Sequence, residues 1–352
     1  MSRPFFSICV PQYNRTSFLI EACRVLCAQT YQDFEVCISD DCSTDGRAEE
    51  LQAFLRASGL HFNYRRQEKN VRYDANLRAS IALAKGRFCL LMGNDDCLAA
   101  PETLEQLRTI LLQHPNTGVA MGNFAEYESG RIWRRVFRTG VAGAGPGIAV
   151  SRFRNFSFVS GVVLRSDRAQ AHSTAKWDGS EMYQMYLGCR ILAEGYELLE
   201  IDEVVVRKNI AVAGEAVDTY AARPRVRPCP VVERSLPLGQ MGRLVCDAVQ
   251  PEAESRWTLG GVKVFLQILL FTYPFWILEY RRVQSWNYAL GICLGMRPRN
   301  LLRQLKFPFI GAVFLRGIYV LVTCAGLLTP LAVFDFFQPK LHVFAKSLFQ
   351  RA

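Results

Sequence analysis

Two apolar, strand-like runs of this chain each end in a pair of adjacent carboxylates. The pairs are Asp40-Asp41 and Asp95-Asp96, which follow the runs at residues 34–38 and 87–92. A single pair would be explained by the preference of Asp for turns and helix N-caps. Two pairs at the ends of two strands of one sheet instead predict a shared crevice, in which carboxylates meet a cation or the hydrogen-bond donors of a sugar or base.

Strand-like and helix-like segments alternate along the first hundred residues. Buried strands are expected at residues 6–10, 34–38, 62–64 and 87–92, and helices at 17–29, 46–58 and 74–85. This alternation predicts an α/β fold of Rossmann type, with a mostly parallel sheet and helices on both faces. Such sheets bind ligands at the carboxyl ends of their strands, where both acidic pairs lie.

Residues 140–147 are rich in glycine. They lack the GxxxxGK[ST] pattern of a phosphate-binding loop, so we expect a flexible loop over an acceptor cleft or a plain linker. Residues 158–164 form another apolar run and are expected to be a buried strand.

The charge and hydropathy of the chain are unevenly distributed. Half of the residues are hydrophobic, and the excess gathers after about residue 258. The formal net charge of +10 comes mainly from arginine, with the surplus downstream of about residue 130. A basic balance suits anionic partners such as phosphates or an acidic membrane surface. We expect no nucleic-acid partner, because no zinc-finger spacing, helix-turn-helix signal or RNP-like motif is present.

The cysteines indicate a reducing compartment. The chain has 12, and Cys9, Cys37 and Cys89 lie inside apolar runs, where a thiol behaves as a small hydrophobic group. No CxxC pair suggests a zinc site, and the apolar run at residues 7–10 is too short for the core of a signal peptide. We therefore expect a cytoplasmic catalytic part.

Several motifs, in order along the chain, resemble family 2 glycosyltransferases of the GT-A fold. They are residues 7–15 (SICVPQYNR), 29–36 (QTYQDFEV), 40–46 (DDCSTDG), 70–76, 84–88 and 93–96 (GNDD). The resemblance covers about residues 5–205 and is strongest up to residue 100. It implies an enzyme that transfers a sugar from a nucleotide-sugar donor.

The resemblance also implies roles for individual residues in donor binding. Pro11 and Tyr13 match positions that line the nucleobase, and Asp41 matches a carboxylate that accepts from a pyrimidine N–H, which points to a UDP or dTDP donor. Arg72 is placed to meet the diphosphate, whereas Asp40 and Asp45 are expected to hold a turn. Tyr13 has an alternative interpretation as a buried aromatic at a strand end.

The segment Asn94-Asp95-Asp96 matches the DxD motif of the family. The match implies Asp96 as the direct ligand of Mn²⁺ or Mg²⁺, and Asp95 directed towards the donor sugar or ribose. Asn94 stands where many members have Asp, which removes one charge from the site and leaves an amide that would reach the sugar.

Family 2 enzymes invert the anomeric centre, so the resemblance implies a single in-line displacement with a general base. The spacing of the family, counted back from Arg190, places the base at Gln184, which cannot accept a proton. Glu181 is our first candidate, one turn earlier and behind Ser180 as an expected N-cap, and Asp178 is the second. Alternatively, Glu181 only interacts with the dipole of the helix start.

The C-terminal part is expected to associate with a membrane. We divide the chain into a transferase domain (1–220), a Pro- and Arg-rich linker (221–256) and a helical region (257–352). The apolar segment 264–278 is short for a span, and 307–334 is interrupted by Arg316. The arginines between the two segments oppose a simple hairpin across the membrane, which favours helices that lie in the interface or re-enter. Core helices of a soluble domain or an oligomer interface are the alternative.

Together these features suggest an acceptor that is itself bound to the membrane. We expect a polyprenyl-diphosphate-linked saccharide, extended at the cytoplasmic face of a bacterial inner membrane during lipopolysaccharide or exopolysaccharide synthesis. A polyprenyl-phosphate glycosyltransferase, which needs no strong base, is one alternative. A degenerate GT-A domain that acts as a membrane scaffold is another.

Overall fold

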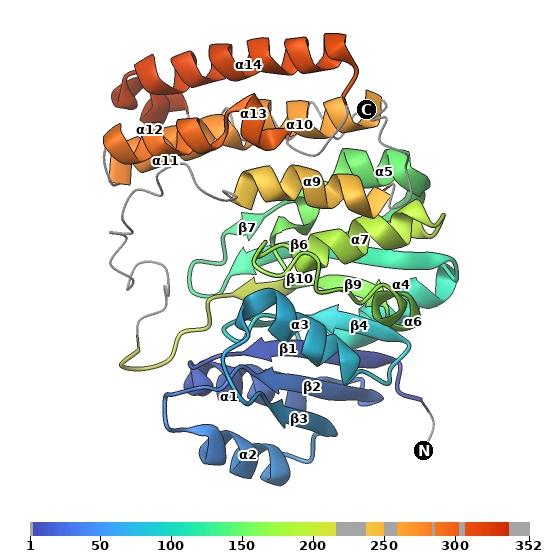
Figure 1. Ribbon diagram of the computed structural model, residues 1–352. Coiled ribbons are helices and arrows are strands. Elements are labelled where there is room, and N and C mark those ends of the chain that lie inside the picture. The colour runs from blue at the N-terminus through green and yellow to red at the C-terminus, as the bar shows by residue number, and fades with distance from the viewer. Residues whose placement is uncertain (1–2, 216–236, 250–258, 284–285, 303–306, 338–352) are drawn as a thin grey trace. The chain divides into compact units, whose positions relative to one another are not determined.

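A computed structural model describes residues 3–215, 237–249, 259–283, 286–302 and 307–337 (Figure 1). The chain divides into two compact units, residues 1–219 and 220–352, each of which is described by itself. The first unit contains every strand among the described residues, and the second contributes helices only.

The first unit is built on a ten-stranded sheet. Its strands are β1 (Phe6–Gln12), β2 (Phe34–Asp40), β3 (Phe62–Arg66), β4 (Phe88–Leu91), β5 (Cys97–Leu98), β6 (Thr117–Glu126), β7 (Ile132–Trp133), β8 (Gly140–Ala144), β9 (Val162–Arg165) and β10 (Glu197–Lys208). The order is β3-β2-β1-β4-β9-β6-β10-β5, with β7 paired to β6 and β8 paired to β10.

The four strands expected from the sequence form a parallel block. β1 pairs with β2 and β4, and β2 pairs with β3, all in parallel. The rest of the sheet is mixed, because β9 runs antiparallel to both β4 and β6. The α/β class is therefore confirmed, but the expectation of a mostly parallel sheet was too simple, since apolar strand patterns do not encode strand direction.

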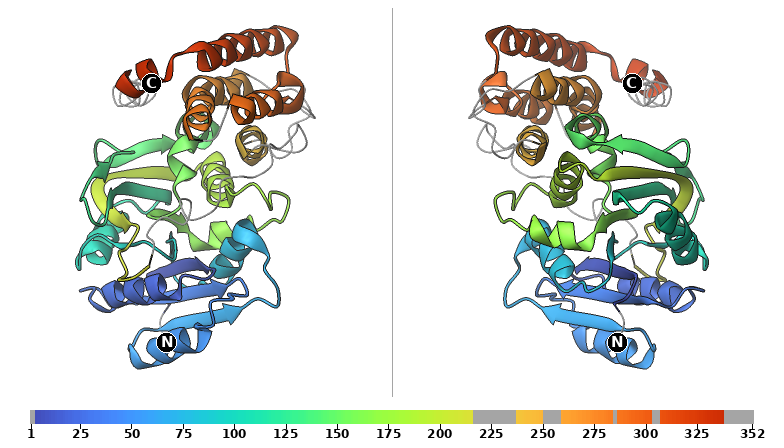
Figure 2. Two further views of the ribbon diagram at one scale, coloured as in Figure 1. Left: turned by 90° about the vertical axis from the view of Figure 1, so that its left-hand side faces the viewer. Right: turned by 90° about the vertical axis from the view of Figure 1, so that its right-hand side faces the viewer.

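Helices cover both faces of this sheet. They are α1 (Thr16–Cys27), α2 (Ala48–Ala57), α3 (Arg72–Ala82), α4 (Thr103–Gln113), α5 (Gly145–Arg152), α6 (Ser166–Ala171) and α7 (Tyr183–Ala193), with a 3-10 turn, η1 (Phe153–Ser157). Figure 2 shows α3, α6 and α7 on one face and α1 and α4 on the other. The apolar strands are buried between these layers, and Cys9, Cys37 and Cys89 are fully buried as expected.

The glycine-rich segment is structured, which corrects the expectation of a loop or linker. Residues 140–144 form β8, which pairs antiparallel with β10, and the helix α5 follows at once. Pro146 stands in the first turn of α5, where its missing N–H costs no hydrogen bond. The expected strand at 158–164 is also shorter, since β9 begins at Val162.

The second unit consists of helices. They are α9 (Pro237–Val249), α10 (Leu259–Phe271), α11 (Tyr273–Val283), α12 (Trp286–Gly295), α13 (Pro298–Leu301) and α14 (Phe309–Leu328). α9 falls within the expected linker, which is therefore partly helical; the other residues of that linker lie outside the described ranges. Residues 260–282 and 309–328 are long and apolar enough to cross a membrane by length and composition.

α14 leaves most of its apolar surface uncovered. Only 11% of its apolar window is buried, against 50% for residues 260–282. Phe309 and Ile310 are 80% and 82% exposed, and Leu321 is 67% exposed. Arg281 donates two hydrogen bonds of 2.7 Å to the carbonyls of Gly326 and Thr329 at the end of α14. Arg281, one of the arginines between the two apolar segments, thus pairs with carbonyl groups at the C-terminus of α14.

Candidate functional site

The carboxyl ends of β1, β2 and β4 bring the motifs of the sequence together. The last residue of β1, Gln12, is in register with Asp40 of β2. Its carbonyl accepts the N–H of Asp41 at 2.8 Å, and its side-chain carbonyl accepts from the amide of Asn94 at 2.8 Å. Both acidic pairs therefore lie at one edge of the sheet, as expected for a parallel block.

The side chain of Asn94 forms hydrogen bonds that connect the end of β4 to the end of β1. In addition to the bond to Gln12, its amide nitrogen lies 3.3 Å from the carbonyl of Asn14 and 3.4 Å from that of Tyr13. All three partners are acceptors, so an Asp at this position would place a carboxylate against three oxygens. This geometry accounts for the neutral first residue of the motif.

Asp96 is a buried carboxylate held by two donors. It is 4% exposed. The hydroxyl of Ser160 donates to its Oδ2, and the backbone N–H of Asn209 donates to its Oδ1 at 3.0 Å. Burial, with the neighbouring charge of Asp95, raises the pKa of Asp96 to about 7 in spite of these donors. A nearby cation would stabilise the charged form of this buried carboxylate.

The carboxylates of Asp95 and Asp96 approach the same point. A side chain at Gly93 would have its Cβ 2.9 Å from Oδ2 of Asp96 and 3.2 Å from Oδ1 of Asp95. Asp95 also pairs with Arg15 at 3.6 Å. These two carboxylates could offer hard oxygen ligands to a divalent cation, which would take its remaining ligands from a diphosphate and water. The described residues contain no cluster of three or more His, Cys, Asp or Glu suited to a metal.

Asp41 supports the local fold as well as facing the site. Its carboxylate accepts the N–H groups of Val71 and Arg72 at the start of α3, at 2.5 and 2.9 Å. Burial raises the pKa of Asp41, while these two donors act in the opposite direction. Asp41 therefore also has a structural role, because it satisfies N–H groups that a helix start leaves unpaired.

The other expected donor-binding residues remain accessible. Tyr13 is 39% exposed, which excludes the interpretation as a buried aromatic. Pro11 is half-buried in β1. Arg72 is exposed, and its guanidinium makes no hydrogen bond or ion pair with a described residue, whereas its backbone N–H donates to Asp41. Asp40 holds the turn as expected, accepting from the N–H of Ser43 at 2.9 Å.

Backbone strain is concentrated around this edge of the sheet. The non-glycine residues with positive φ in the described ranges are Asn14, Arg15, Cys42, Arg72, Glu181 and Asn209. Asn14 and Arg15 follow β1, and Cys42 follows Asp41. The backbone N–H groups of Arg72 and Asn209 donate to Asp41 and Asp96, and Glu181 is the candidate base. Left-handed conformations of such residues persist only where the surroundings enforce them, and they cluster at functional sites.

The segment that carries the candidate bases differs from its expected form. α7 begins at Tyr183, with Met182 as its N-cap residue and no side-chain cap, so Ser180 does not cap the helix and Glu181 precedes it. Among the described residues, the hydroxyl of Ser180 accepts only the N–H of Met182, the residue before the helix, whereas Asp74, distant in the chain, accepts the N–H groups of Glu181 and Tyr183. Glu181 has φ 60° and an exposed side chain.

The two candidate bases are in different situations. Asp178 forms a two-contact ion pair with Arg78, one contact at 2.8 Å. Glu181 makes no side-chain hydrogen bond or ion pair with a described residue. Gln184, on which the expected spacing of the base fell, donates to the carbonyl of Phe156 at 3.1 Å and accepts from the hydroxyl of Tyr73 at 3.1 Å. These contacts favour Glu181 over Asp178 as an available proton acceptor.

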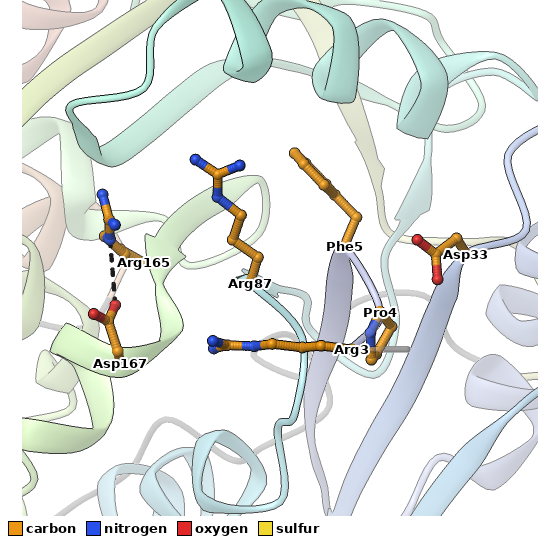
Figure 3. A pocket seen from close by; sticks show the side chains of 7 residues that line it. All are labelled: Arg3, Pro4, Phe5, Asp33, Arg87, Arg165 and Asp167. Atoms are coloured by element: carbon orange, nitrogen blue, oxygen red, sulfur yellow. Dashed lines mark ion pairs between the residues drawn. The ribbon is translucent and has the colours of Figure 1, made fainter. Parts of the chain in front are cut away.

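A cavity of about 310 Å³ lies at the opposite, amino end of the parallel strands (Figure 3). Its wall contains three arginines, but Arg165 pairs with Asp167 at 3.4 Å and Arg3 donates to the carbonyls of Lys85 and Gly86. This cavity lacks the paired carboxylates and strained loops of the other edge.

Sequence reasoning missed four residues of the site: Arg15, Asp74, Ser160 and Asn209. Arg15 lies within the first motif and was passed over as part of it. Ser160 was assigned to a strand interior, and Asn209 follows β10 with no motif of its own. Asp74 and Arg78 are spaced i and i+4, which places them on one helix face and was a usable signal.

Comparison with known proteins finds similarity to glycosyltransferases. Glycosyl transferase family 2 matches residues 7–163. Abequosyltransferase RfbV of Salmonella typhimurium is 38% identical over 107 residues, which are 30% of this chain and 32% of that protein. Glycosyltransferase GlyG of Streptococcus pneumoniae is 30% identical over 124 residues, 35% of this chain and 40% of its own. The chain thus spans well under half the length of these relatives.

Solved structures share the fold at low sequence identity. The chain is similar to TarS 1–349 of S. aureus in complex with UDP-GlcNAc, with a TM-score of 0.61, 15% identity and 91% of each chain covered. It is also similar to the mannosyltransferase PcManGT of Pyrobaculum calidifontis in complex with GDP-Man and Mn²⁺, with a TM-score of 0.52, 13% identity, and 99% and 88% covered. Residues 7–163 thus match glycosyl transferase family 2, and the chain shares the GT-A fold of these solved structures.

Proposed function

We propose that this protein transfers a sugar from a nucleotide-diphosphate donor, of UDP or dTDP type, to a hydroxyl group of a lipid-linked saccharide. The observation that carries the proposal is the meeting of Asp41, Asp95 and Asp96 at one sheet edge within the family domain. Tyr13 is exposed beside this edge and offers a face for a base, and Arg72 offers an uncommitted charge for a diphosphate.

The residues at this edge fit a divalent cation, and we propose Mn²⁺ or Mg²⁺. Asp96 is the direct ligand, and Asp95 lies beside it and faces the donor sugar or ribose. The cation, when bound, neutralises charge on the leaving diphosphate. The raised pKa of Asp96 and the close approach of the two carboxylates support this assignment. PcManGT binds Mn²⁺ together with its donor, which is consistent with it.

The proposed reaction is a single displacement with inversion. The acceptor oxygen bonds to the anomeric carbon as the bond from that carbon to the diphosphate oxygen breaks, and the nucleoside diphosphate leaves. The hydroxyl proton passes to a carboxylate, which we assign to Glu181, with Asp178 as the second candidate. The exposed, unpaired carboxylate of Glu181 supports this order.

The helices of the second unit have features that suit association with a membrane. We propose that α14 and residues 260–282 hold the enzyme at the cytoplasmic face of a bacterial inner membrane, near an acceptor on polyprenyl diphosphate. The exposed apolar face of α14 supports lipid contact, and the exposed Arg316 suits an anionic surface. The relative RfbV is an abequosyltransferase, which accords with synthesis of a surface polysaccharide such as lipopolysaccharide.

One observation favours a second acceptor class. The family position of the base is occupied by Gln184, a buried side chain with both ends hydrogen-bonded. A polyprenyl phosphate is already ionised at neutral pH and needs no strong base. The second candidate function is therefore transfer to a lipid phosphate.

The test is a transfer assay with the purified full chain across UDP-, dTDP- and GDP-sugars. Nucleoside diphosphate release and sugar incorporation are measured with polyprenyl-diphosphate saccharides or polyprenyl phosphate, in Mn²⁺, Mg²⁺ or EDTA. We expect metal-dependent transfer that Asp96→Asn lowers by on the order of 10²–10³-fold. Asp167→Asn, a matched change at the far cavity, should leave it intact. If the protein neither binds nor consumes a donor under any of these conditions, the degenerate scaffold is favoured and the proposal is overturned.

A further inference from the structure

The candidate base segment is held by a carboxylate from another helix. Asp74, in the first turn of α3, accepts the N–H groups of Gly179 at 2.9 Å, Glu181 at 2.8 Å and Tyr183 at 3.0 Å. Asp74 is 2% exposed, so these charge-assisted bonds are shielded from water. α7 has no side-chain cap of its own, and Asp74 supplies that acceptor from outside the helix.

A second side chain on the same face of α3 holds the same segment. Arg78 lies one turn after Asp74, pairs with Asp178 and donates to the carbonyl of Thr174 at 2.9 Å. The backbone from residue 174 to residue 183 is thus attached to α3 at both ends.

The same N-terminal half of α3 is attached to the donor side of the site. Asp41 accepts the N–H groups of Val71 and Arg72, and the amide of Asn76 donates to the carbonyl of Gln12 at 3.0 Å. α3 is therefore one rigid element in contact with the proposed nucleobase carboxylate, the end of β1 and the candidate base segment.

Glu181 needs this support because its backbone is left-handed. A φ of 60° is sparsely populated by residues with a Cβ, and the bond from its N–H to Asp74 is the contact that fixes it. The positions of the Glu181 Cα and Cβ follow from that conformation, and with them the region that its exposed carboxylate can reach.

We propose that Asp74 is a positioning residue for sugar transfer: through the N–H groups of residues 179, 181 and 183 it sets the place of the Glu181 segment relative to the donor site, which contacts the same end of α3. The inference rests on the proposed function. It adds a residue that touches no substrate and acts only through Glu181.

The test variant is Asp74→Asn. Asn has the same size, but one of its two terminal groups is NH₂, which cannot accept a hydrogen bond. At least one of the three backbone N–H groups therefore loses its acceptor. Displacement of a reacting group by about 1 Å costs on the order of 10²-fold in rate. We expect kcat to fall by about that factor, with nucleotide affinity by calorimetry unchanged within about threefold. Hydrogen exchange of a peptide spanning residues 174–184 should become faster.

The matched control is Glu35→Gln. Glu35 is also a buried carboxylate that accepts two backbone N–H groups, from Lys85 at 2.6 Å and Gly86 at 3.2 Å, but it lies near the amino end of β2. We expect a comparable fall in Tm with kcat unchanged. If Asp74→Asn proves insoluble, Arg78→Gln releases the same segment and gives the same two readouts.

A double mutant separates positioning from general stability. If Asp74 acts through Glu181, Asp74→Asn added to Glu181→Gln gives no further loss of kcat. Losses that multiply, or a wild-type kcat in Asp74→Asn, would overturn the inference. If the wild type binds nucleotide but transfers no sugar, the proposed function fails instead, and the exchange measurement alone still reports whether Asp74 holds the segment.

Discussion

Ser160 donates its hydroxyl proton to the carboxylate of Asp96 and accepts the N–H of Gly93 at 2.8 Å, and so joins the start of β9 to the carboxyl end of β4. The backbone carbonyl of Ser160 accepts from the buried guanidinium of Arg135 at 2.9 Å. The proposed metal ligand is thus oriented by neighbours as well as by its own strand.

The first prediction concerns metal dependence. Asp96→Asn removes the anionic ligand but preserves shape, so turnover should fall by on the order of 10²–10³-fold, the loss typical of removing a group that stabilises developing charge. Ser160→Ala keeps the carboxylate and loses its orientation, so its activity should recover with excess Mn²⁺ while that of Asp96→Asn should not. Wild-type turnover in EDTA, together with an active Asp96→Asn, would contradict the assignment.

The second prediction concerns nucleotide recognition by Asp41. Asp41→Asn preserves one acceptor for the N–H groups of Val71 and Arg72 but weakens acceptance from a pyrimidine N–H. Loss of a charge-assisted bond costs about 1.5–3 kcal/mol, so UDP affinity by calorimetry should fall about ten- to a hundredfold. Because Asp41 also holds the start of α3, Tm should fall as well. Asp45→Asn, which alters only a turn carboxylate bound to Thr16, serves as the control and should keep UDP affinity.

The third prediction distinguishes the two candidate bases. Glu181→Gln should lower kcat by about 10²–10⁴-fold and spare donor binding, because only the proton acceptor is lost. Asp178→Asn breaks the ion pair with Arg78 and should have a smaller effect on kcat. The reverse order would reassign the base to Asp178. If both variants are fully active while Asp96→Asn is dead, the nucleophile is a lipid phosphate rather than a hydroxyl group.

The fourth prediction concerns the exposed face of α14. Burial of one large apolar side chain is worth about 1.5–3 kcal/mol. Replacing Phe309, Ile310 and Leu321 by Ser should therefore lower binding to vesicles of phosphatidylglycerol and phosphatidylethanolamine by at least about 10²-fold in flotation. Leu112→Ser, at a 45% exposed apolar position of the first unit, is the control and should bind as the wild type. Equal flotation of both variants would contradict lipid contact by α14.

The sequence was sufficient for the parallel block and its acidic edge. The apolar runs ending at Asp41 and Asp96 are local features, and parallel strands necessarily bring their carboxyl ends to one side. The resemblance to the family, the α/β class and the proximity of the two acidic pairs could therefore be obtained without coordinates. Periodicity also located α1, α2 and α3 to within a few residues.

The tertiary structure decided what holds these side chains in place. The partners of Asp96 are 64 and 113 residues away in the chain, and the amide of Glu181 bonds to Asp74 across 107 residues. A local pattern suggested Ser180 as the cap of α7, but a buried carboxylate with three N–H donors in reach is a better acceptor than a hydroxyl group. Such contacts depend on how β9, β10 and α3 pack, and no short stretch of sequence encodes that packing.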